Sequence, residues 1–182
     1  SFNPKPKAEE GAEAAVPRFW TPRNEGLQNV TINGIKVNNK DEKVLYCTTD
    51  GGFHRSEDQG ATWKLSSGGL ASMYVGRITI DYNNPDTILL APAYVYFPVG
   101  VHKSTDGGRT WTQKNTGLTN LAAMWIEADP KEPWKVFLAT WGGGVMISWD
   151  TGGSWSAYSA GLSSLQGYCV VAGGADPRAT FA

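Results

Sequence analysis

Apolar residues recur at alternate positions along most of the chain, which is the period of a β-strand. Four segments with this pattern are centred on the pairs Ile35/Val37, Ile78/Ile80, Ile126/Ala128 and Val170/Ala172. The first three are followed by turn-forming residues at 38–41, 83–86 and 129–132, where Pro fixes φ and Asn or Asp bonds to the local backbone. Because no stretch after residue 17 has the length and period of an amphipathic helix, the pattern predicts an all-β chain.

Two more strands follow in each of the first three segments. The second strands are predicted at Val44–Cys47, Ile88–Ala91 and Val136–Ala139, and the third strands at Phe53–Arg55, Val101–Lys103 and Val145–Ile147. A polar turn then reverses the chain into a fourth strand that is expected to carry a Trp. Each unit is thus predicted to be four antiparallel strands, at about 27–66, 70–114 and 118–158, with parts of a further unit at 18–24 and 168–182.

The turn before each Trp repeats a motif, Ser-x-Asp-x-Gly-x-Thr/Ser-Trp. Its residues are Ser56, Asp58, Gly60 and Trp63, then Ser104, Asp106, Gly108 and Trp111, then Ser148, Asp150, Gly152 and Trp155. A Gly-Leu pair ends seven residues after each Trp, and Trp20 has the same pair without the motif, so the Trp spacings are 43, 48 and 44 residues. Four-stranded units repeated at this period are typical of β-propeller blades.

The motif predicts a turn rather than a catalytic site. An Asp carboxylate accepts backbone N–H groups across such a hairpin, the Gly tolerates positive φ, and the Trp covers the turn. The twelve motif residues are therefore interpreted as structural, on the rim away from the usual ligand face.

This motif resembles the Asp box, also called the bacterial neuraminidase repeat, over roughly residues 18–182. The resemblance implies a sialidase-like propeller; similar repeats occur in xyloglucan-cleaving glycoside hydrolases, sortilin-type receptors and photosystem II stability/assembly factors. It specifies the fold and leaves function open, since the fold hosts many activities. About three complete blades and parts of a fourth leave three alternatives: a piece of a longer protein, a ring shared by two copies, or a tight four-bladed ring. The first of these is favoured.

Residues 1–17 differ from the rest of the chain. Three Pro and an Ala/Glu run predict an extended linker or arm. No basic-then-apolar leader and no transmembrane run is present in the 182 residues. The usual location of proteins with such repeats and the absence of an initial Met favour a periplasmic or extracellular location.

Composition excludes several kinds of partner and cofactor. The formal net charge of −1 gives no basic face for nucleic acid. His54 and His102 stand alone, so neither a metal site nor a cofactor is expected. Cys47 and Cys169 are interpreted as small thiols on strands.

The loops between second and third strands are the expected ligand face. One of them is long and aromatic, and the next carries a Trp, so the candidate binding residues are Tyr94, Tyr96, Phe97 and Trp141. Aromatic side chains beside Gly-rich backbone suit a protein hot spot or a sugar, and equally suit packing over a blade edge.

Asp50 is the candidate catalytic carboxylate. Residues 45–55 resemble the segment of xyloglucan-cleaving hydrolases in which a strand-end Asp is catalytic. Glycoside hydrolysis requires two carboxylates, and the sequence identifies no second one beyond the weak candidate Glu127 on an innermost strand. Arg77 alone does not make the three-Arg clamp of a sialidase. The sequence therefore favours a non-catalytic module that binds a protein partner, with a xyloglucanase-like enzyme or a carbohydrate-binding propeller as the alternative.

Overall fold

The computed structural model describes residues 21–93, 96, 98–172 and 180–181, and every regular element within them is a strand. Three antiparallel sheets of four strands follow one another along the chain. Blade A is β1 (Ile32–Val37), β2 (Leu45–Thr49), β3 (Gly52–Ser56) and β4 (Lys64–Leu65). Blade B is β5 (Arg77–Ile80), β6 (Ile88–Ala91), β7 (His102–Ser104) and β8 (Thr112–Gln113). Blade C is β9 (Ala123–Ala128), β10 (Val136–Thr140), β11 (Gly144–Ser148) and β12 (Ser156–Ala157).

A last antiparallel pair follows blade C, β13 (Val171–Ala172) with β14 (Thr180–Phe181). The first three apolar pairs expected on innermost strands lie in β1, β5 and β9; of the fourth pair, Ala172 lies in β13 and Val170 immediately precedes that strand. The prediction of four-stranded units is thus confirmed, and second and third strands fall within one or two residues of their expected bounds.

The fourth strands differ from the prediction. β4, β8 and β12 each begin one residue after the Trp that they were expected to carry. The Trp is outside the ladder because its backbone N–H bonds elsewhere: Trp63 to Glu25 O, Trp111 to Gly68 O and Trp155 to Thr116 O, at 2.8–3.0 Å. Gly68 and Thr116 lie after the fourth strand of the preceding blade, and Glu25 lies ahead of blade A.

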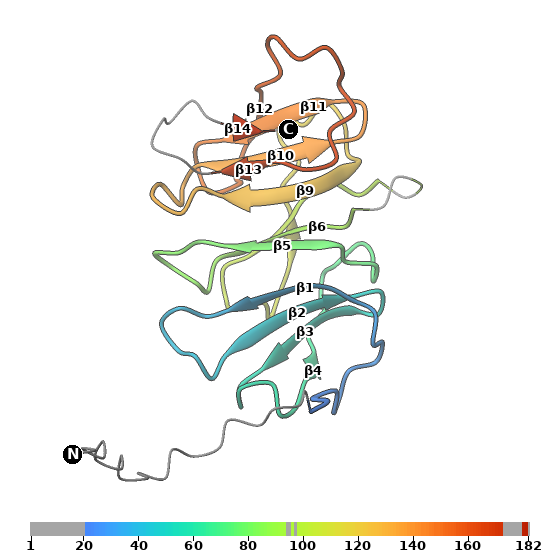
Figure 1. Ribbon diagram of the computed structural model, residues 1–182, viewed down its shortest axis with the longest axis vertical. Coiled ribbons are helices and arrows are strands. Elements are labelled where there is room, and N and C mark those ends of the chain that lie inside the picture. Colours follow the sequence, from blue (N-terminus) through green and yellow to red (C-terminus); the bar gives the residue numbers. More distant parts are fainter. Residues whose placement is uncertain (1–20, 94–95, 97, 173–179, 182) are drawn as a thin grey trace, which may run out of the picture.

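The blades stack face to face in an open arc, with β1, β5, β9 and β13 in succession along it (Figure 1). Two apolar cores fill the spaces between blades. Tyr46 and Phe53 of blade A are fully buried against Ile78 and Leu90 of blade B. A second cluster joins blade B to blade C through the buried side chains of Leu89, Val101, Ile126, Leu138 and Met146.

A Trp latch joins each blade to the unit before it. The indole Nε1–H donates to a carbonyl of that unit at 2.9 Å in three cases: Trp63 to Arg23, Trp111 to Ser66 and Trp155 to Lys114. The Gly of the Gly-Leu pair lies under the Trp backbone, at φ +86° for Gly26, +90° for Gly69 and +84° for Gly117. A Cβ at any of these three would collide with the Trp carbonyl oxygen. The Gly-Leu pair is therefore the seat for the next blade's Trp.

A buried imidazole also holds the segment that follows the Gly-Leu pair. The Ala71 N–H donates to His102 Nε2 at 3.1 Å, and the Gln28 N–H approaches His54 Nε2 at 3.4 Å. In blade C the matching position is Met146, whose Sδ lies 3.8 Å from Thr119 Oγ1. Burial lowers the pKa of both histidines below 6.5, so both imidazoles are neutral in the folded chain.

We predict a loss of stability in mild acid from this arrangement. The unfolded chain binds a proton near pH 6.5 and the folded chain only at lower pH, so stability is complete above 6.5 and decreases as the pH falls below it. Each His adds a slope of up to about 1.4 kcal/mol per pH unit. His102→Met, which copies blade C, should flatten the curve of unfolding free energy measured between pH 8 and 5. An unchanged curve would show that His102 is not a source of the pH dependence.

Candidate functional site

The loops separate into two rims. The β2–β3 and β10–β11 hairpins and the β6–β7 connection emerge on one rim, here called the loop rim, on the right in Figure 1. The three motif turns, here called Asp turns, emerge on the opposite rim beside the turns between first and second strands. Backbone bonds join the two sets, for example Gln59 N–H to Lys43 O and Gly107 N–H to Asp86 O, both at 2.9 Å.

Each Asp turn is closed by its own side chains. Ser56 Oγ donates to Asp58 Oδ1 at 2.7 Å and accepts the Gly60 N–H at 2.8 Å. Asp58 in turn accepts the backbone N–H of Thr62 at 2.8 Å and its hydroxyl at 2.6 Å. The same bonds recur from Ser104 and Asp106 with Gly108 and Thr110, and from Ser148 and Asp150 with Gly152 and Ser154.

The Asp carboxylates of these turns are strongly acidic. Bonds from the Thr62 hydroxyl and N–H hold the pKa of Asp58 at about 2. For Asp106 and Asp150, partial burial acts to raise the pKa, but the hydrogen bonds together outweigh it and leave the pKa at about 2. A carboxyl that stays ionised at neutral pH and is saturated by turn donors is poorly suited to act as an acid.

On the loop rim, polar and aromatic groups form a continuous row across the three blades. Asn33 Nδ2 donates to Asp50 Oδ1 at 2.8 Å and to Val75 O at 3.1 Å. Arg77 Nη1 donates to Asn33 O at 2.9 Å, and its guanidinium lies 4.5 Å from the ring centre of Trp125. The row thus runs from Asp50 in blade A to Trp125 in blade C.

Two donors in this row have no hydrogen-bond partner among the described residues. They are the buried Nε of Arg77 and the buried Nε1 of Trp125. Arg77 and Trp125 each lie seven residues after the Leu of a Gly-Leu pair, but this spacing gives no signal that the two side chains stack.

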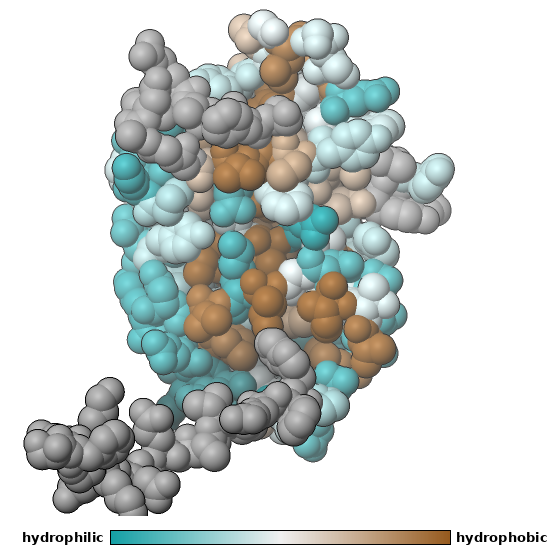
Figure 2. All heavy atoms as spheres, viewed as in Figure 1, coloured by the Kyte–Doolittle hydropathy of each residue, from teal (hydrophilic) through white to brown (hydrophobic). Residues whose placement is uncertain are grey.

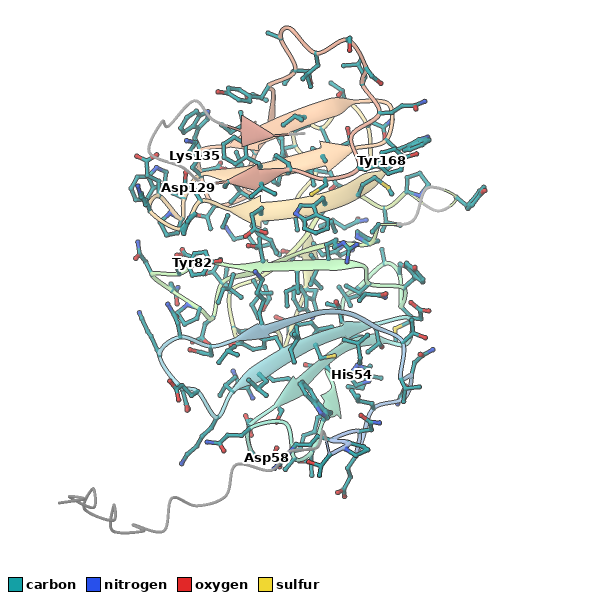
Figure 3. The ribbon with its side chains drawn as sticks, in the orientation of Figure 1. His54, Asp58, Tyr82, Asp129, Lys135 and Tyr168 are labelled. Atoms are coloured by element: carbon teal, nitrogen blue, oxygen red, sulfur yellow. The ribbon has the colours of Figure 1, made fainter. Side chains whose placement is uncertain are left out.

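Aromatic side chains continue the loop rim beyond the row. Trp141 meets Tyr168 edge to face, with ring centres 4.6 Å apart, and its backbone bridges to Gln166. Tyr168 is 62% exposed and Tyr96, on the β6–β7 connection, is 77% exposed. Figure 3 shows Tyr168 on this rim and Tyr82, Asp129 and Lys135 toward the other. Tyr94 and Phe97, the other predicted binding residues, lie outside the described residues, and Tyr168 was not anticipated.

In the described part of the chain, no hydrogen bond joins Asp50 to a second carboxylate. Its side chain accepts a hydrogen bond from Asn33 Nδ2. Glu127 on β9 is paired with Lys36 of β1 at 3.9 Å, and burial raises its pKa despite that lysine. Among the described residues, no three His, Cys, Asp or Glu side chains gather as metal ligands. Cys47 and Cys169 are free thiols, and burial raises the pKa of Cys47 to about 11.

Comparison with known proteins identifies the architecture. No known protein family and no curated protein matches the chain. Solved structures do match, including the extracellular domain of a hybrid two-component system from B. thetaiotaomicron (TM-score 0.66, 14% identity, 84% of this chain and 22% of that one). The GH74 enzyme of Niastella koreensis gives a TM-score of 0.62 at 25% identity, over 81% of this chain and 21% of that one. YCF48 bound to D1 peptide gives 0.58 at 14% identity, over 79% and 45%.

The described chain is a partial β-propeller. It spans less than half the length of each of these structures. The predicted fold, three complete blades with parts of a fourth, is confirmed. The propeller relatives include both enzymes and a peptide-binding protein, so the likeness alone does not assign a role. No helix in the described part of the propeller is long and apolar enough to cross a membrane.

Proposed function

We propose that this propeller segment is a non-catalytic interaction module that binds a protein partner through its loop rim. The observation that carries the proposal is the Trp141–Tyr168 pair together with the exposed Tyr96 of the β6–β7 connection, on the rim that also holds Arg77 stacked on Trp125. Trp, Tyr and Arg are the residues enriched at binding hot spots, because they combine large apolar area with a polar end.

The form of the rim favours an extended peptide segment. Tyr96 and Tyr168 are carried by connections of different blades, so a ligand that reaches both must cross the rim. Asp50, Asn33 and Arg77 would supply its polar contacts. YCF48, a propeller with the same fold, was solved with a D1 peptide bound, which supports the peptide reading. In this account the Asp turns are Asp boxes of the sialidase-like kind, and the module acts outside the cytoplasm, as one relative does.

The test is selection of ligands from an unstructured peptide library on the immobilised protein, in parallel with a glycan array. We expect enriched peptides whose affinity falls at least 10-fold in Trp141→Ala and Tyr168→Ala, because hot-spot truncation costs about 2 kcal/mol or more. Trp134→Ala is the matched control, since Trp134 is 46% exposed in the β9–β10 turn of the opposite rim. Peptides that bind all three variants equally would place the site elsewhere.

A glycan-active propeller is the second candidate, and Asp50 is the observation in its favour. The carboxylate lies at the end of β2 on the loop rim, and Glu127 is a half-buried carboxyl with a raised pKa, the property of a general acid. Turnover of xyloglucan that Asp50→Ala abolishes would establish this reading. Binding of glucan oligosaccharides without turnover, and without peptide enrichment, would instead indicate a carbohydrate-binding module.

A further inference from the structure

The connection that leads into each of β1, β5, β9 and β13 carries the same short turn, here called a tip turn. It begins two residues after the Leu of the Gly-Leu pair, with an Asn or Ser whose side-chain oxygen accepts the N–H two residues further on. The four bonds, at 2.7–3.2 Å, are Asn29 Oδ1 with Thr31, Ser72 Oγ with Tyr74, Asn120 Oδ1 with Ala122 and Ser164 Oγ with Gln166. The tip turn is therefore a repeated part of the fold, although its residues vary from unit to unit.

The middle residue of every tip turn is apolar and exposed. These residues are Val30, Met73, Leu121 and Leu165, with exposed fractions of 69%, 44%, 38% and 49%. Turns favour Gly, Pro, Asn, Asp and Ser, so an exposed apolar side chain at one repeated turn position has no explanation in turn chemistry. Met73 lies between blades A and B and Leu121 between blades B and C, so the exposure of these two does not depend on how the arc continues.

The tip turns are fixed on the loop rim by contacts with the preceding blade. Leu121 O accepts the N–H of Gly100, in the β6–β7 connection, at 3.0 Å. Met73 lies against the β2–β3 hairpin, because a Cβ added to Gly52 would come within 2.9 Å of Met73 Cε. The apolar side chains are thus held in place before a ligand arrives, which lowers the entropy lost on binding.

The loop rim is almost free of charge. Across 26–33, 69–77, 117–124 and 161–168, the two hairpins 49–52 and 140–144, and the described part of the β6–β7 connection, the charged residues are Asp50 and Arg77. Every turn of the opposite rim contains at least one charged residue. Figure 2 shows the same division, with strongly hydrophilic side chains gathered along the left edge and hydrophobic ones reaching the surface on the right, at the loop rim.

We infer that the tip turns select a partner segment by its apolar side chains. The segment would be an extended, uncharged stretch of peptide that places one apolar side chain on Met73 and another on Leu121. Apolar contact removes area from water at both tips, whereas a charged peptide would lose hydration on this rim with few opposite charges to replace it. This inference rests on the proposed function and names the class of peptide that the loop rim would take.

A membrane surface suits this rim less well than a peptide. Proteins that bind the surface of anionic bilayers combine apolar side chains with several Lys and Arg. In the described rim segments, Arg77 is the one such residue, and its guanidinium is already stacked on Trp125 and bonded to Asn33 O. The charge of the rim therefore favours an uncharged protein segment.

The test uses peptides selected on the immobilised protein and substitutions in the tip turns. We expect the selected peptides to be poor in charge, and each of Met73→Ser and Leu121→Ser to weaken their binding at least about 5-fold. Trp149→Ser is the control, because it removes a larger side chain, 58% exposed, from an Asp turn, and should leave the affinity unchanged. Selection repeated on Met73→Lys should enrich peptides with Asp or Glu in place of one apolar residue, a gain that misfolding cannot produce.

The outcomes that would overturn this inference differ from those that would overturn the proposed function. Peptides that lose affinity in Trp141→Ala, but bind Met73→Ser and Leu121→Ser as tightly as the unsubstituted protein, would remove the tip turns from the site and leave the proposed function standing. The same peptides enriched on Met73→Lys would have the same meaning. A library from which no peptide is enriched would overturn both, and flotation of the protein with phosphatidylcholine vesicles would then identify a membrane as the occupant.

Discussion

Trp111→Ala is expected to lower the free energy of unfolding by about 3–5 kcal/mol, the usual cost of truncating a buried Trp. The side chain is 4% exposed, packs edge to face on Phe53 with ring centres 4.8 Å apart, and donates to Ser66 O of the preceding blade. The substitution therefore removes both the core packing on Phe53 and the indole hydrogen bond that joins the two blades. The loss of unfolding free energy is measured by urea unfolding followed by far-ultraviolet circular dichroism. An m-value equal to that of the unsubstituted protein confirms that the two values can be compared.

The exposed Trp149 provides the comparison for this result. Trp149→Ala removes the same number of atoms from a side chain that is 58% exposed, and should change stability by no more than about 0.5 kcal/mol. If the two substitutions cost the same, the blades are not held together by the Trp latch as we describe.

Gly117→Ala should destabilise the protein by about 2 kcal/mol more than Gly161→Ala. Both Gly residues have nearly the same φ, +84° and +89°, so both variants bear the left-handed strain of about 1–2 kcal/mol. Only the Cβ at residue 117 meets the carbonyl oxygen of Trp155, and such overpacking adds about 1–3 kcal/mol.

Unfolding free energies of the two variants, measured in the same buffer, give the difference directly. Equal losses would mean that the Gly-Leu pair is selected for its backbone conformation alone and that contact with the next Trp contributes nothing.

The strands were predictable because each depends on local pattern. Alternating apolar pairs fix the faces of β1, β5 and β9, and the Pro and Asn turns separate them from the second strands. The interval from Trp to Gly-Leu set the repeat. What the sequence could not show is that the Gly after one Trp lies under the next Trp, since that contact joins residues 37–42 positions apart, as Gly26 with Trp63 and Gly69 with Trp111.

The loop rim was predicted only in part. Trp141 was identified from its place after a second strand, but its partner Tyr168 comes from the start of the following unit, in a segment without a repeated motif. Likewise, the stacking of Arg77 on Trp125 depends on the distance between two blades rather than on any spacing in the chain. Contacts between blades are set by tertiary packing, so a one-dimensional pattern gives them no signal.

The most direct test of the central claim is the hydrogen-exchange footprint of a peptide selected on the immobilised protein. The account predicts slower amide exchange in the β2–β3 and β10–β11 hairpins and around Tyr96 and Tyr168, with no change in the three Asp turns. Protection confined to the Asp turns, or to the exposed face of β1, would contradict a binding site on the loop rim.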